Sequence, residues 1–199
     1  MPATVDVTEI HSIDKNMKTI HIRPRTPEMP SIDEELEHII DELGIRNNPE
    51  QERAVRIVAK HFILQSEEQL LMYLGGGAGT GKSYVIKVIV KLFKRCGYSD
   101  ELLVSAPTGC AAILIEGYTI HALTFLPKSN YPLNHAGLEN IWKTVKYLII
   151  DEVSMIGALF LSQVSQRICQ AKAGTLQTEK TRLAVSTSSF AETSASCHQ

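Results

Sequence analysis

The stretch Gly76-Gly77-Ala78-Gly79-Thr80-Gly81-Lys82-Ser83 decides the fold, and it follows directly on the apolar run Leu70-Leu71-Met72-Tyr73-Leu74. This order predicts a strand, a tight loop and then a helix. Glycines allow the backbone to turn so that successive N–H groups point into one concavity, which can hold the phosphates of a nucleotide. A glycine-rich turn at a helix start is the plainer alternative, but it requires neither the lysine nor the hydroxyl at these positions.

The last two residues of this loop have distinct expected roles. Lys82 reaches the β- and γ-phosphates, and Ser83 offers its hydroxyl to a magnesium ion. The helix that follows is predicted from about residue 83 to residue 95, with Gly97 as its stop, and its positive end faces the same anion. The basic side of this helix is either a nucleic-acid stripe or a solvated face, and the solvated face is preferred.

A second motif lies at residues 147–152, which read Tyr-Leu-Ile-Ile-Asp-Glu. Its continuous apolar run is typical of a strand buried on both faces of a parallel sheet. Asp151 is predicted to hold the magnesium ion, and Glu152 is predicted to orient and deprotonate an attacking water. An Asp-Glu pair after a strand is by itself usually a polar turn, so this prediction depends on the phosphate loop that precedes it.

Between these motifs lies a third block, Leu102-Leu103-Val104-Ser105-Ala106-Pro107-Thr108-Gly109-Cys110-Ala111-Ala112, which again predicts strand, turn and helix start. With Thr119-Ile120-His121 and Leu148-Ile149-Ile150-Asp151-Glu152-Val153-Ser154-Met155, these motifs resemble superfamily-one DNA helicases of the Pif type. The resemblance covers roughly residues 47–173 in the family's motif order. It implies an α/β fold of the P-loop NTPase (RecA-like) class, a parallel sheet with flanking helices, incomplete at the C-terminus.

The resemblance also implies ligands. ATP and Mg²⁺ are the implied cofactors, and single-stranded DNA is the implied partner. Pro107, Thr108 and Gly109 would contact the sugar-phosphate backbone of that strand, and His121 would lie close to its track. Thr108 and the turn amides can donate to phosphate without reading sequence. For His121, a packed and hydrogen-bonded core histidine is an equally good interpretation.

Gln51 also has two interpretations. Asn48 is a predicted helix cap, Pro49 takes the first helical position, and Gln51 closes a capping box. The family nevertheless places at this point a glutamine that hydrogen-bonds the adenine, and one amide can read both the donor and the acceptor of that base. Adenine contact is preferred for Gln51, with Asn48 retained as the cap.

Composition bounds the remaining possibilities. The chain has 199 residues, 44% of them hydrophobic, and a net charge of −2, so nucleic-acid affinity would come from local basic groups rather than a global field. Its four cysteines show no paired or metal-ligand spacing, which favours a reducing compartment. No signal peptide or membrane span is predicted. We therefore expect an intracellular protein, in the nucleus or the mitochondrion if the organism is eukaryotic.

Three segments are predicted. Residues 1–30 are polar and interrupted by prolines, so they are expected to be disordered. Residues 31–174 form the partial first motor domain, opened by a capping box at Ser31 and a helix that Gly44 stops. Residues 124–140 are expected to be an insertion loop. Residues 175–199 hold ten serines and threonines and are expected to be a polar, disordered tail.

The tail has a second interpretation. The family should continue with a strand that ends in Gly-Asp-x-x-Gln-Leu-Pro-Pro. When the tail is back-translated and the frame is shifted by two nucleotides, a permitted choice of synonymous codons encodes Cys-Gly-Val-Asn-Leu-Ile-Ile-Cys-Gly-Asp-Phe-Arg-Gln-Leu-Pro-Pro. We therefore infer a frameshift, a mis-spliced exon or a gene-model error near Gly174, with a genuine alternative tail as the other possibility.

Function is expected at two levels. The resemblance implies an ATP-dependent DNA helicase that runs along single strands in replication, repair, recombination and telomere maintenance. The 199 residues contain no second motor domain, whose arginines would complete the ATP site. They are therefore expected to bind nucleotide weakly, to hydrolyse it slowly and not to unwind DNA. The alternatives are a non-catalytic nucleotide- or DNA-binding fragment and a ring-forming ATPase; the Ala-Pro-Thr-Gly block argues against the ring-forming ATPase.

Overall fold

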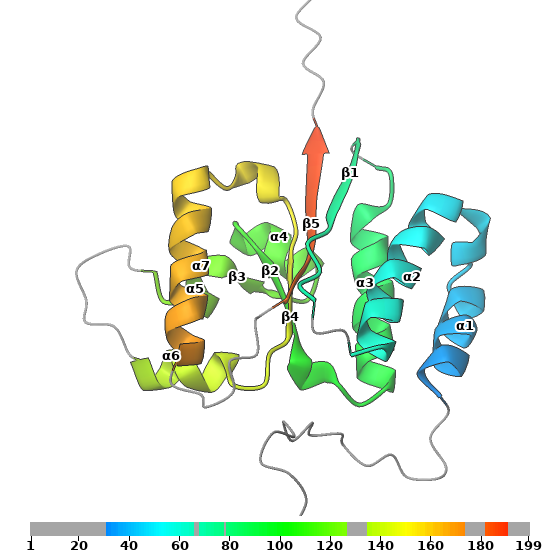
Figure 1. The fold of residues 1–199 in the computed structure, drawn as a ribbon. Helices are drawn as coiled ribbons and strands as arrows, with labels where there is room; N and C mark the ends of the chain where they lie inside the picture. Colours follow the sequence, from blue (N-terminus) through cyan, green and yellow to red (C-terminus); the bar gives the residue numbers. More distant parts are fainter. Residues whose placement is uncertain (1–30, 66–67, 78, 127–134, 174–181, 191–199) are drawn as a thin grey trace, which may run out of the picture.

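The computed structural model describes residues 31–65, 68–77, 79–126 and 135–173, and the backbone of residues 182–190. These residues form one parallel five-stranded sheet with helices on both faces (Figure 1). The strands lie in the spatial order β1 (Tyr73–Gly77), β5 (Arg182–Phe190), β4 (Tyr147–Ile150), β2 (Leu102–Ala106) and β3 (Tyr118–Thr119). This is the predicted α/β class.

Each face of the sheet carries its own helices and its own core. One hydrophobic cluster includes residues of α1 (Ile32–Glu42), α2 (Pro49–Ile63), α3 (Lys82–Arg95) and α4 (Gly109–Leu114). The other cluster lies under α5 (Ile120–Thr124), α6 (His135–Trp142) and α7 (Ala158–Ala173). Three short 3₁₀ helices connect these elements, at Ile45–Asn47, Ser99–Glu101 and Val153–Met155. In Figure 1 the sheet lies between α1, α2 and α3 on one side and α5, α6 and α7 on the other.

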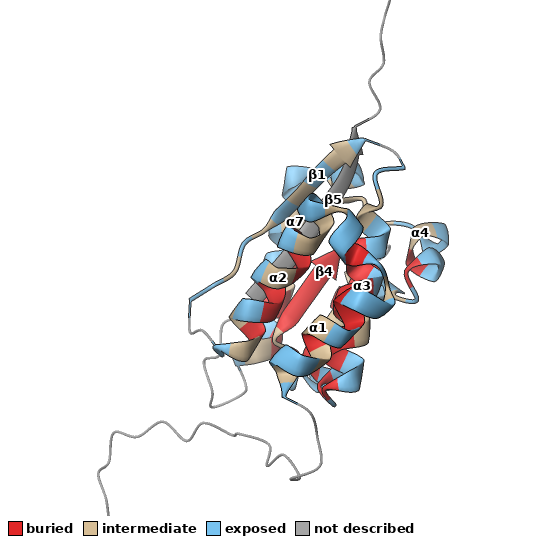
Figure 2. Cartoon of the chain, turned by 90° about the vertical axis from the view of Figure 1, so that its right-hand side faces the viewer, coloured by how far each residue is buried: buried red, intermediate tan, exposed pale blue. Residues whose placement is uncertain are grey.

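Strand β4 lies in the middle of the molecule. All four of its residues are buried, and Figure 2 shows it as a buried strand flanked by helices. Tyr147 and Ile149 belong to one core, whereas Leu148 and Ile150 belong to the other. This alternation explains the uninterrupted apolar run, because a central parallel strand has no solvent-facing side.

The first helix begins and ends as its sequence predicts. The Ser31 hydroxyl accepts from the N–H of Glu34, and the Glu34 carboxylate accepts from the N–H of Ser31, so both halves of the capping box form. Helix α1 ends at Glu42, and Gly44 follows in the left-handed conformation with φ of 63°. Its buried residues, Leu36, Ile39 and Ile40, recur at the helical period and pack against α2 and α3.

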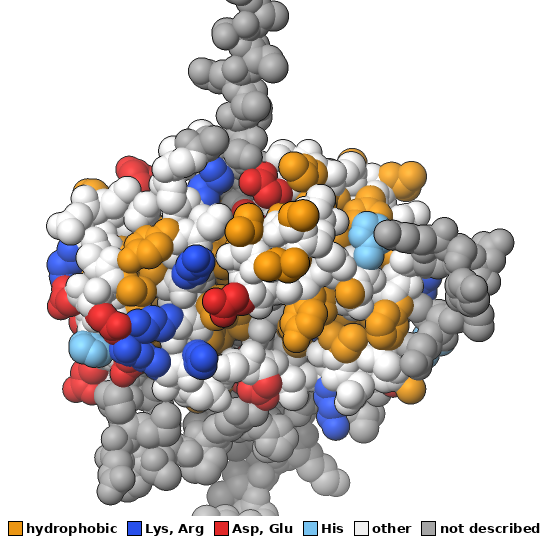
Figure 3. Space-filling view, turned by 180° about the vertical axis from the view of Figure 1, so that it is seen from behind, with side chains coloured by type: hydrophobic (Ala, Val, Ile, Leu, Met, Phe, Trp, Pro, Cys, Tyr) orange, Lys and Arg blue, Asp and Glu red, His pale blue; other side chains and the backbone are white. Residues whose placement is uncertain are grey.

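The basic side of α3 is in part a contact between helices. Lys91 and Arg95 both pair with Glu42 of α1, and Arg95 also pairs with Glu35. Figure 3 shows acidic and basic side chains intermingled over this half of the molecule. These two basic residues therefore attach α1 to α3, whereas Lys87 and Lys94 are exposed as expected of a solvated face.

The expected insertion loop at residues 124–140 is shorter in the structure. Helix α5 ends at Thr124 and α6 already begins at His135, while residues 127–134 lie outside the described part. The prolines and asparagines that predicted the loop all lie within residues 127–134. From His135 on, the chain is helical, and this helix places Leu138 and Trp142 in the core. Burial of these two side chains favours the helix over the predicted loop.

The C-terminal tail differs from its expected disorder. Residues Arg182–Phe190 form β5, which pairs in parallel with β1 on one side and with β4 on the other. The ladder with β4 shifts register between Leu148 and Ile149. Without β5, β1 would have no pairing partner among the described strands and β4 would be paired on one side only. This position outweighs the low strand propensity of a serine-rich run. Residues 1–30 and the rest of the tail lie outside the described residues.

Candidate functional site

The glycine-rich loop connects the end of β1 to the start of α3, as predicted. Lys82 is the first residue of α3, and its ammonium group donates to the carbonyl oxygens of Gly76 at 2.9 Å and Gly77 at 2.8 Å. Thr80 donates its hydroxyl to the same Gly77 oxygen at 2.9 Å. Gly81 precedes the helix in the left-handed conformation, with φ of 82°, which favours glycine. Ala78 lies outside the described residues.

Gln51 crosses from α2 to this loop. Its amide nitrogen donates to the carbonyl oxygen of Thr80 at 3.1 Å. A methyl group added at Gly81 would approach the same nitrogen to 2.2 Å. Of the capping box considered for Gln51, the half in which its side chain would return to the Asn48 N–H is wrong, because this side chain contacts the loop instead. Asn48 caps α2 by accepting from the Gln51 N–H at 3.3 Å.

The two predicted magnesium ligands lie side by side. The Ser83 hydroxyl is 3.4 Å from a carboxylate oxygen of Asp151, although the two residues are 68 positions apart. Asp151 directly follows β4, is only 5% exposed, and donates its backbone N–H to the Ser105 carbonyl oxygen at 2.8 Å. A hydroxyl and a carboxylate are the oxygen donors that Mg²⁺ takes in nucleotide sites. The pair therefore fits this cation in its chemistry and its position beside the loop.

Glu152 has an unusual backbone. It adopts φ of 54° and ψ of 40°, and its N–H donates to the Asp151 carboxylate at 3.0 Å. A non-glycine residue in the left-handed region costs free energy and is typical of functional turns. The Glu152 side chain is half-buried. Both carboxylates thus start from the same tight turn after β4, as the Asp-Glu motif requires.

Ser105 is a residue of this site that the motif analysis passed over. It is fully buried in β2, and its hydroxyl donates to the Ile149 carbonyl oxygen at 3.1 Å. Its own carbonyl oxygen accepts the Asp151 N–H. Ser105 therefore connects β2 to the end of β4 at Ile149 and at Asp151, the predicted metal ligand. A small polar residue inside an otherwise apolar strand was the sequence signal that could have identified it.

The turn after β2 holds the predicted DNA contacts. Pro107 and Thr108 connect β2 to α4, which begins at Gly109. The Thr108 hydroxyl accepts from the N–H of Ala111 at 3.2 Å and caps α4. This leaves the hydroxyl proton available as a donor, because a hydroxyl can accept and donate at once. Gly109 is exposed and has open space around its α-carbon.

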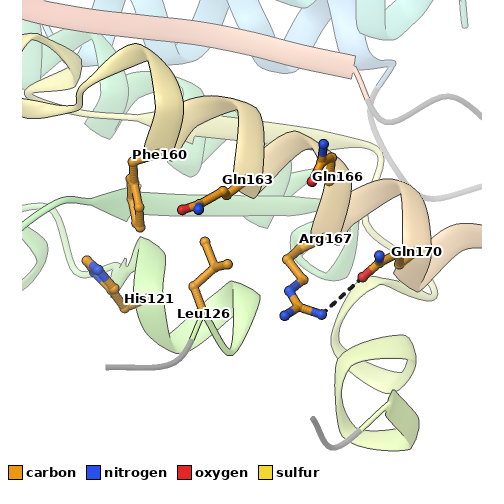
Figure 4. A pocket seen from close by; sticks show the side chains of 7 residues that line it. All are labelled: His121, Leu126, Phe160, Gln163, Gln166, Arg167 and Gln170. Carbon is orange, nitrogen blue, oxygen red and sulfur yellow. Dashed lines mark hydrogen bonds between the residues drawn. The ribbon is translucent and has the colours of Figure 1, made fainter. Parts of the chain in front are cut away.

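His121 lies apart from that turn, on α5. Its ring is half-buried and packs against Phe160 of α7, with ring centroids 4.6 Å apart and planes inclined at 34°. Figure 4 shows both rings at one end of a cavity between α5 and α7. His121 is therefore neither a fully buried core residue nor a freely solvated one.

These features place a phosphate-binding loop, a hydroxyl and two carboxylates at the carboxyl ends of β1 and β4. Ligands of open parallel sheets bind at such an edge. Among the described residues, no group of three or more histidine, cysteine or acidic side chains could hold a metal ion by itself. In the part of the chain that the structure describes, no helix is long and apolar enough to cross a membrane.

Comparison with known proteins places these motifs in a family. The family model described as "AAA domain" matches residues 51–176. The chain is 29% identical over 125 residues to the ATP-dependent DNA helicase RRM3 of Saccharomyces cerevisiae, covering 59% of this chain and 16% of that protein. It is 34% identical over 111 residues to the ATP-dependent DNA helicase PIF1 of Mus musculus, covering 51% of this chain and 16% of that protein. The chain thus spans about one sixth of the length of these relatives.

Solved structures agree on the fold. The crystal structure of the Pif1 helicase from Candida albicans superposes with a TM-score of 0.54 and 24% identity, covering 71% of this chain and 32% of that one. The Pif1 of Bacteroides sp in complex with ADP-AlF4 gives a TM-score of 0.53 and 22% identity over the same shares. The relatives that the chain matches are thus named as Pif1 and RRM3 helicases, and, with a family model that matches more than half of its length, the chain belongs to the AAA domain family.

Proposed function

We propose that this chain binds ATP with Mg²⁺ and is the nucleotide-binding part of a Pif-type, ATP-dependent DNA helicase that moves along single-stranded DNA. Relatives of that name support the proposal. A Pif1 of Bacteroides has been solved bound to single-stranded DNA, which supports that partner. Work on DNA in replication, repair, recombination and telomere maintenance would place the protein in the nucleus or the mitochondrion of a eukaryote.

One observation carries the proposal. The Ser83 hydroxyl and the Asp151 carboxylate converge to 3.4 Å beside a loop whose lysine already points at the loop carbonyls. The Asp151 carboxylate also accepts the Glu152 N–H at 3.0 Å, so its oxygens lie at the carboxyl end of β4. A hydroxyl and a carboxylate placed together there suit a Mg²⁺ ion that arrives with the nucleotide.

Each residue has one task in the proposed reaction. Lys82 leaves the Gly76 and Gly77 oxygens and holds the outer phosphates, while Gln51 faces the adenine. Ser83 and Asp151 would hold Mg²⁺, and the ion would supply positive charge against the phosphate oxygens. Glu152 orients the attacking water and accepts its proton at a carboxylate oxygen. The Glu152 side chain is half-buried, so part of it is in contact with solvent.

Binding of a fluorescent ATP analogue to the 199-residue chain tests the nucleotide proposal. Lys82→Ala is expected to weaken binding at least about tenfold, because it removes a charge-assisted contact. Lys87→Ala is the matched control, since it removes an exposed lysine from the same helix. Asp151→Asn should abolish the gain in affinity that Mg²⁺ gives. Equal binding by all variants, with or without Mg²⁺, would contradict the proposal.

A non-catalytic nucleotide- or DNA-binding role is the second candidate. It is considered because the part of RRM3 and of PIF1 that the chain matches is 16% of each protein, and a hydrolytic motor of that kind uses groups from two domains. Nucleotide affinity without turnover by the 199-residue chain would support this role. Robust DNA-stimulated hydrolysis that Lys82→Ala abolishes would exclude it.

A further inference from the structure

A cavity of about 470 Å³ lies between α5 and α7, on the sheet face opposite α1, α2 and α3. Its size falls in the range of ligand clefts, roughly 300–1,000 Å³. Figure 4 shows side chains of the two helices directed toward this space. We call it the α5–α7 groove, and the lining residues that matter here are His121, Leu126, Phe160, Gln163, Arg167 and Gln170.

One end of the groove is aromatic. The rings of His121 and Phe160 lie 4.6 Å apart, tilted by 34°, and both residues are only half-buried. Their remaining ring surface borders the cavity. Exposed aromatic faces are the platforms on which unpaired bases stack, irrespective of sequence, because every base has a π-face.

The other end of the groove is polar and cationic. Arg167 is half-buried and donates to the Gln170 side-chain oxygen at 3.1 Å, which fixes its guanidinium at the groove (Figure 4). Gln163 and Gln166 add amide donors and acceptors. Among the described residues that line the groove, none carries a carboxylate, although the whole chain has a net charge of −2. A phosphate at this end would therefore lie near the positive charge of Arg167.

These side chains share one face of α7. Phe160, Gln163, Arg167 and Gln170 follow each other at spacings of three or four residues, which is the period of a helix face. The adjoining face carries the buried Val164, Ile168 and Ala171. Helix α7 therefore packs with an apolar side and offers a second side on which an aromatic ring, amides and a cation alternate along the groove.

We propose that the α5–α7 groove binds single-stranded nucleic acid, with one base against the His121–Phe160 pair and the adjoining phosphate at Arg167. The proposal rests on the proposed function and extends it, because His121 is also a predicted neighbour of the DNA track. It adds α7 to the contact surface, which would otherwise consist of the turn at Pro107–Gly109. A protein ligand is disfavoured, because the groove mixes amides and a cation with little aliphatic surface.

The test measures binding of a labelled oligothymidylate to the 199-residue chain by fluorescence anisotropy, at several salt concentrations. Arg167→Gln should weaken binding several-fold and lower the slope of log K against log salt by about 0.7, the value for one phosphate contact on a single strand. Phe160→Leu should weaken binding about tenfold and leave the slope unchanged, because stacking involves no counterion. Arg53→Gln is the control, since Arg53 is exposed on α2, across the sheet.

A second measurement locates the strand directly. An oligothymidylate that carries 5-iodouracil, irradiated in the complex, should cross-link to the peptide with Phe160 or the peptide with His121. Circular dichroism confirms that each variant is folded. Cross-links confined to other peptides, or unchanged affinity in both groove variants, would overturn the groove proposal.

The outcomes separate the two proposals. If Thr108→Ala weakens binding while Phe160→Leu and Arg167→Gln do not, the groove proposal fails and the DNA-binding part of the proposed function stands. A wild-type chain that binds the fluorescent ATP analogue but no oligothymidylate overturns the groove and the DNA partner, and leaves the nucleotide site. A chain that binds neither ligand overturns both proposals.

Discussion

The side chains of Lys82 and Gln51 already donate to carbonyl oxygens of the glycine-rich loop. The Lys82 ammonium donates to two carbonyl oxygens, and the Gln51 amide donates to Thr80. A nucleotide must therefore exchange these bonds for bonds to phosphate and base rather than simply add new ones. Because such an exchange gains little net free energy per bond, specificity at this site depends on which bonds the ligand can replace.

Gln51→Ala is expected to reduce the preference for ATP over GTP by about tenfold. The alanine cannot offer both a donor and an acceptor to the adenine edge, and one or two hydrogen bonds to a ligand are worth about 1–2 kcal/mol. Competition of ATP and GTP against a fluorescent analogue measures the ratio. Asn48 still caps α2, so an unchanged melting temperature accompanies the loss. A variant that keeps full discrimination would show that Gln51 only braces the loop.

Glu152→Gln separates binding from hydrolysis. The amide keeps the size of the side chain and the strained turn but cannot accept a proton from water, so turnover of ATP should fall about 10²–10⁴-fold. Affinity for the nucleotide should change less than about twofold. Phosphate release and analogue binding are measured on the same preparation. Because Glu152 has φ of 54°, Glu152→Gly is a useful companion that relieves the backbone and also lacks the base.

Among the elements, α1 depends most on charge. Glu37 of α1 pairs with Arg56 of α2 and with Arg46 after α1, and Glu35 and Glu42 pair with α3. Hydrogen bonds from Arg56 and then Arg46 lower the pKa of Glu37 from 4.5 to about 2. Lys91 and Arg95 likewise lower the pKa of Glu42. Acid is therefore expected to loosen α1 before the sheet.

The pH dependence of that loosening has a definite sign. Since folding lowers the pKa of Glu37, its contribution to stability is complete above pH 4.5 and disappears as the pH falls toward about 2. The Glu37 side chain is 44% exposed, so solvent screening limits the effect to less than about 1 kcal/mol. Thermal melts between these pH values should show a steeper loss for the wild type than for Glu37→Gln. Parallel curves would contradict this assignment.

The capping box of α1 gives a second test at this scale. Ser31→Ala removes the hydroxyl that accepts from the Glu34 N–H at 3.1 Å and should lower the free energy of unfolding by about 1 kcal/mol. Ser31→Asp should restore most of that loss, because aspartate is an equally good cap. Chemical denaturation followed by circular dichroism measures both variants. A loss in Ser31→Asp equal to that in Ser31→Ala would rule out capping as the cause.

At the scale of the whole molecule, β5 connects the two halves of the nucleotide site. Strand β1, which delivers the glycine-rich loop, pairs with β5, and β5 pairs with β4, which delivers Asp151. Within the described residues, the sheet order puts no other strand beside β1. The relative positions of Ser83 and Asp151 consequently depend on the backbone pairing of β5.

Replacement of residues 184–199 by the shifted-frame peptide Cys-Gly-Val-Asn-Leu-Ile-Ile-Cys-Gly-Asp-Phe-Arg-Gln-Leu-Pro-Pro should raise the free energy of unfolding by more than about 1 kcal/mol. The reason is that the run Val-Asn-Leu-Ile-Ile fits a strand inside a parallel sheet far better than Ser186-Thr187-Ser188-Ser189-Phe190, which it replaces. Fluorescence of Trp142, the single tryptophan of the chain, reports unfolding. A chain shortened after Ala173 should be less stable than either.

The origin of the tail can be read from the transcript. We propose that the nucleotide sequence across the codon of Gly174 continues in the shifted frame through Leu-Pro-Pro. A transcript and a peptide that both match the tail as written would instead make β5 a genuine alternative strand. In that case the replacement above should still gain stability, so the thermodynamic prediction and the question of origin are tested independently.

The sequence by itself determined the elements that depend on near neighbours. The order of strand, glycine loop and helix, the cap at Ser31 and the position of Asp151 at a strand end follow from residues a few places apart, where period and capping chemistry act. The fold class follows as well, because these units combine in few ways. All of them appear in the structure.

Only the tertiary structure decided the contacts between distant residues. The Gln51 side chain reaches Thr80 across 29 positions, Lys91 and Arg95 turn to α1, and His121 meets Phe160 to form the groove. The polar tail enters the sheet between β1 and β4. Each of these contacts depends on which surfaces the packed helices and strands bring together. Local patterns do not encode that arrangement, because the residues in contact lie far apart in the sequence.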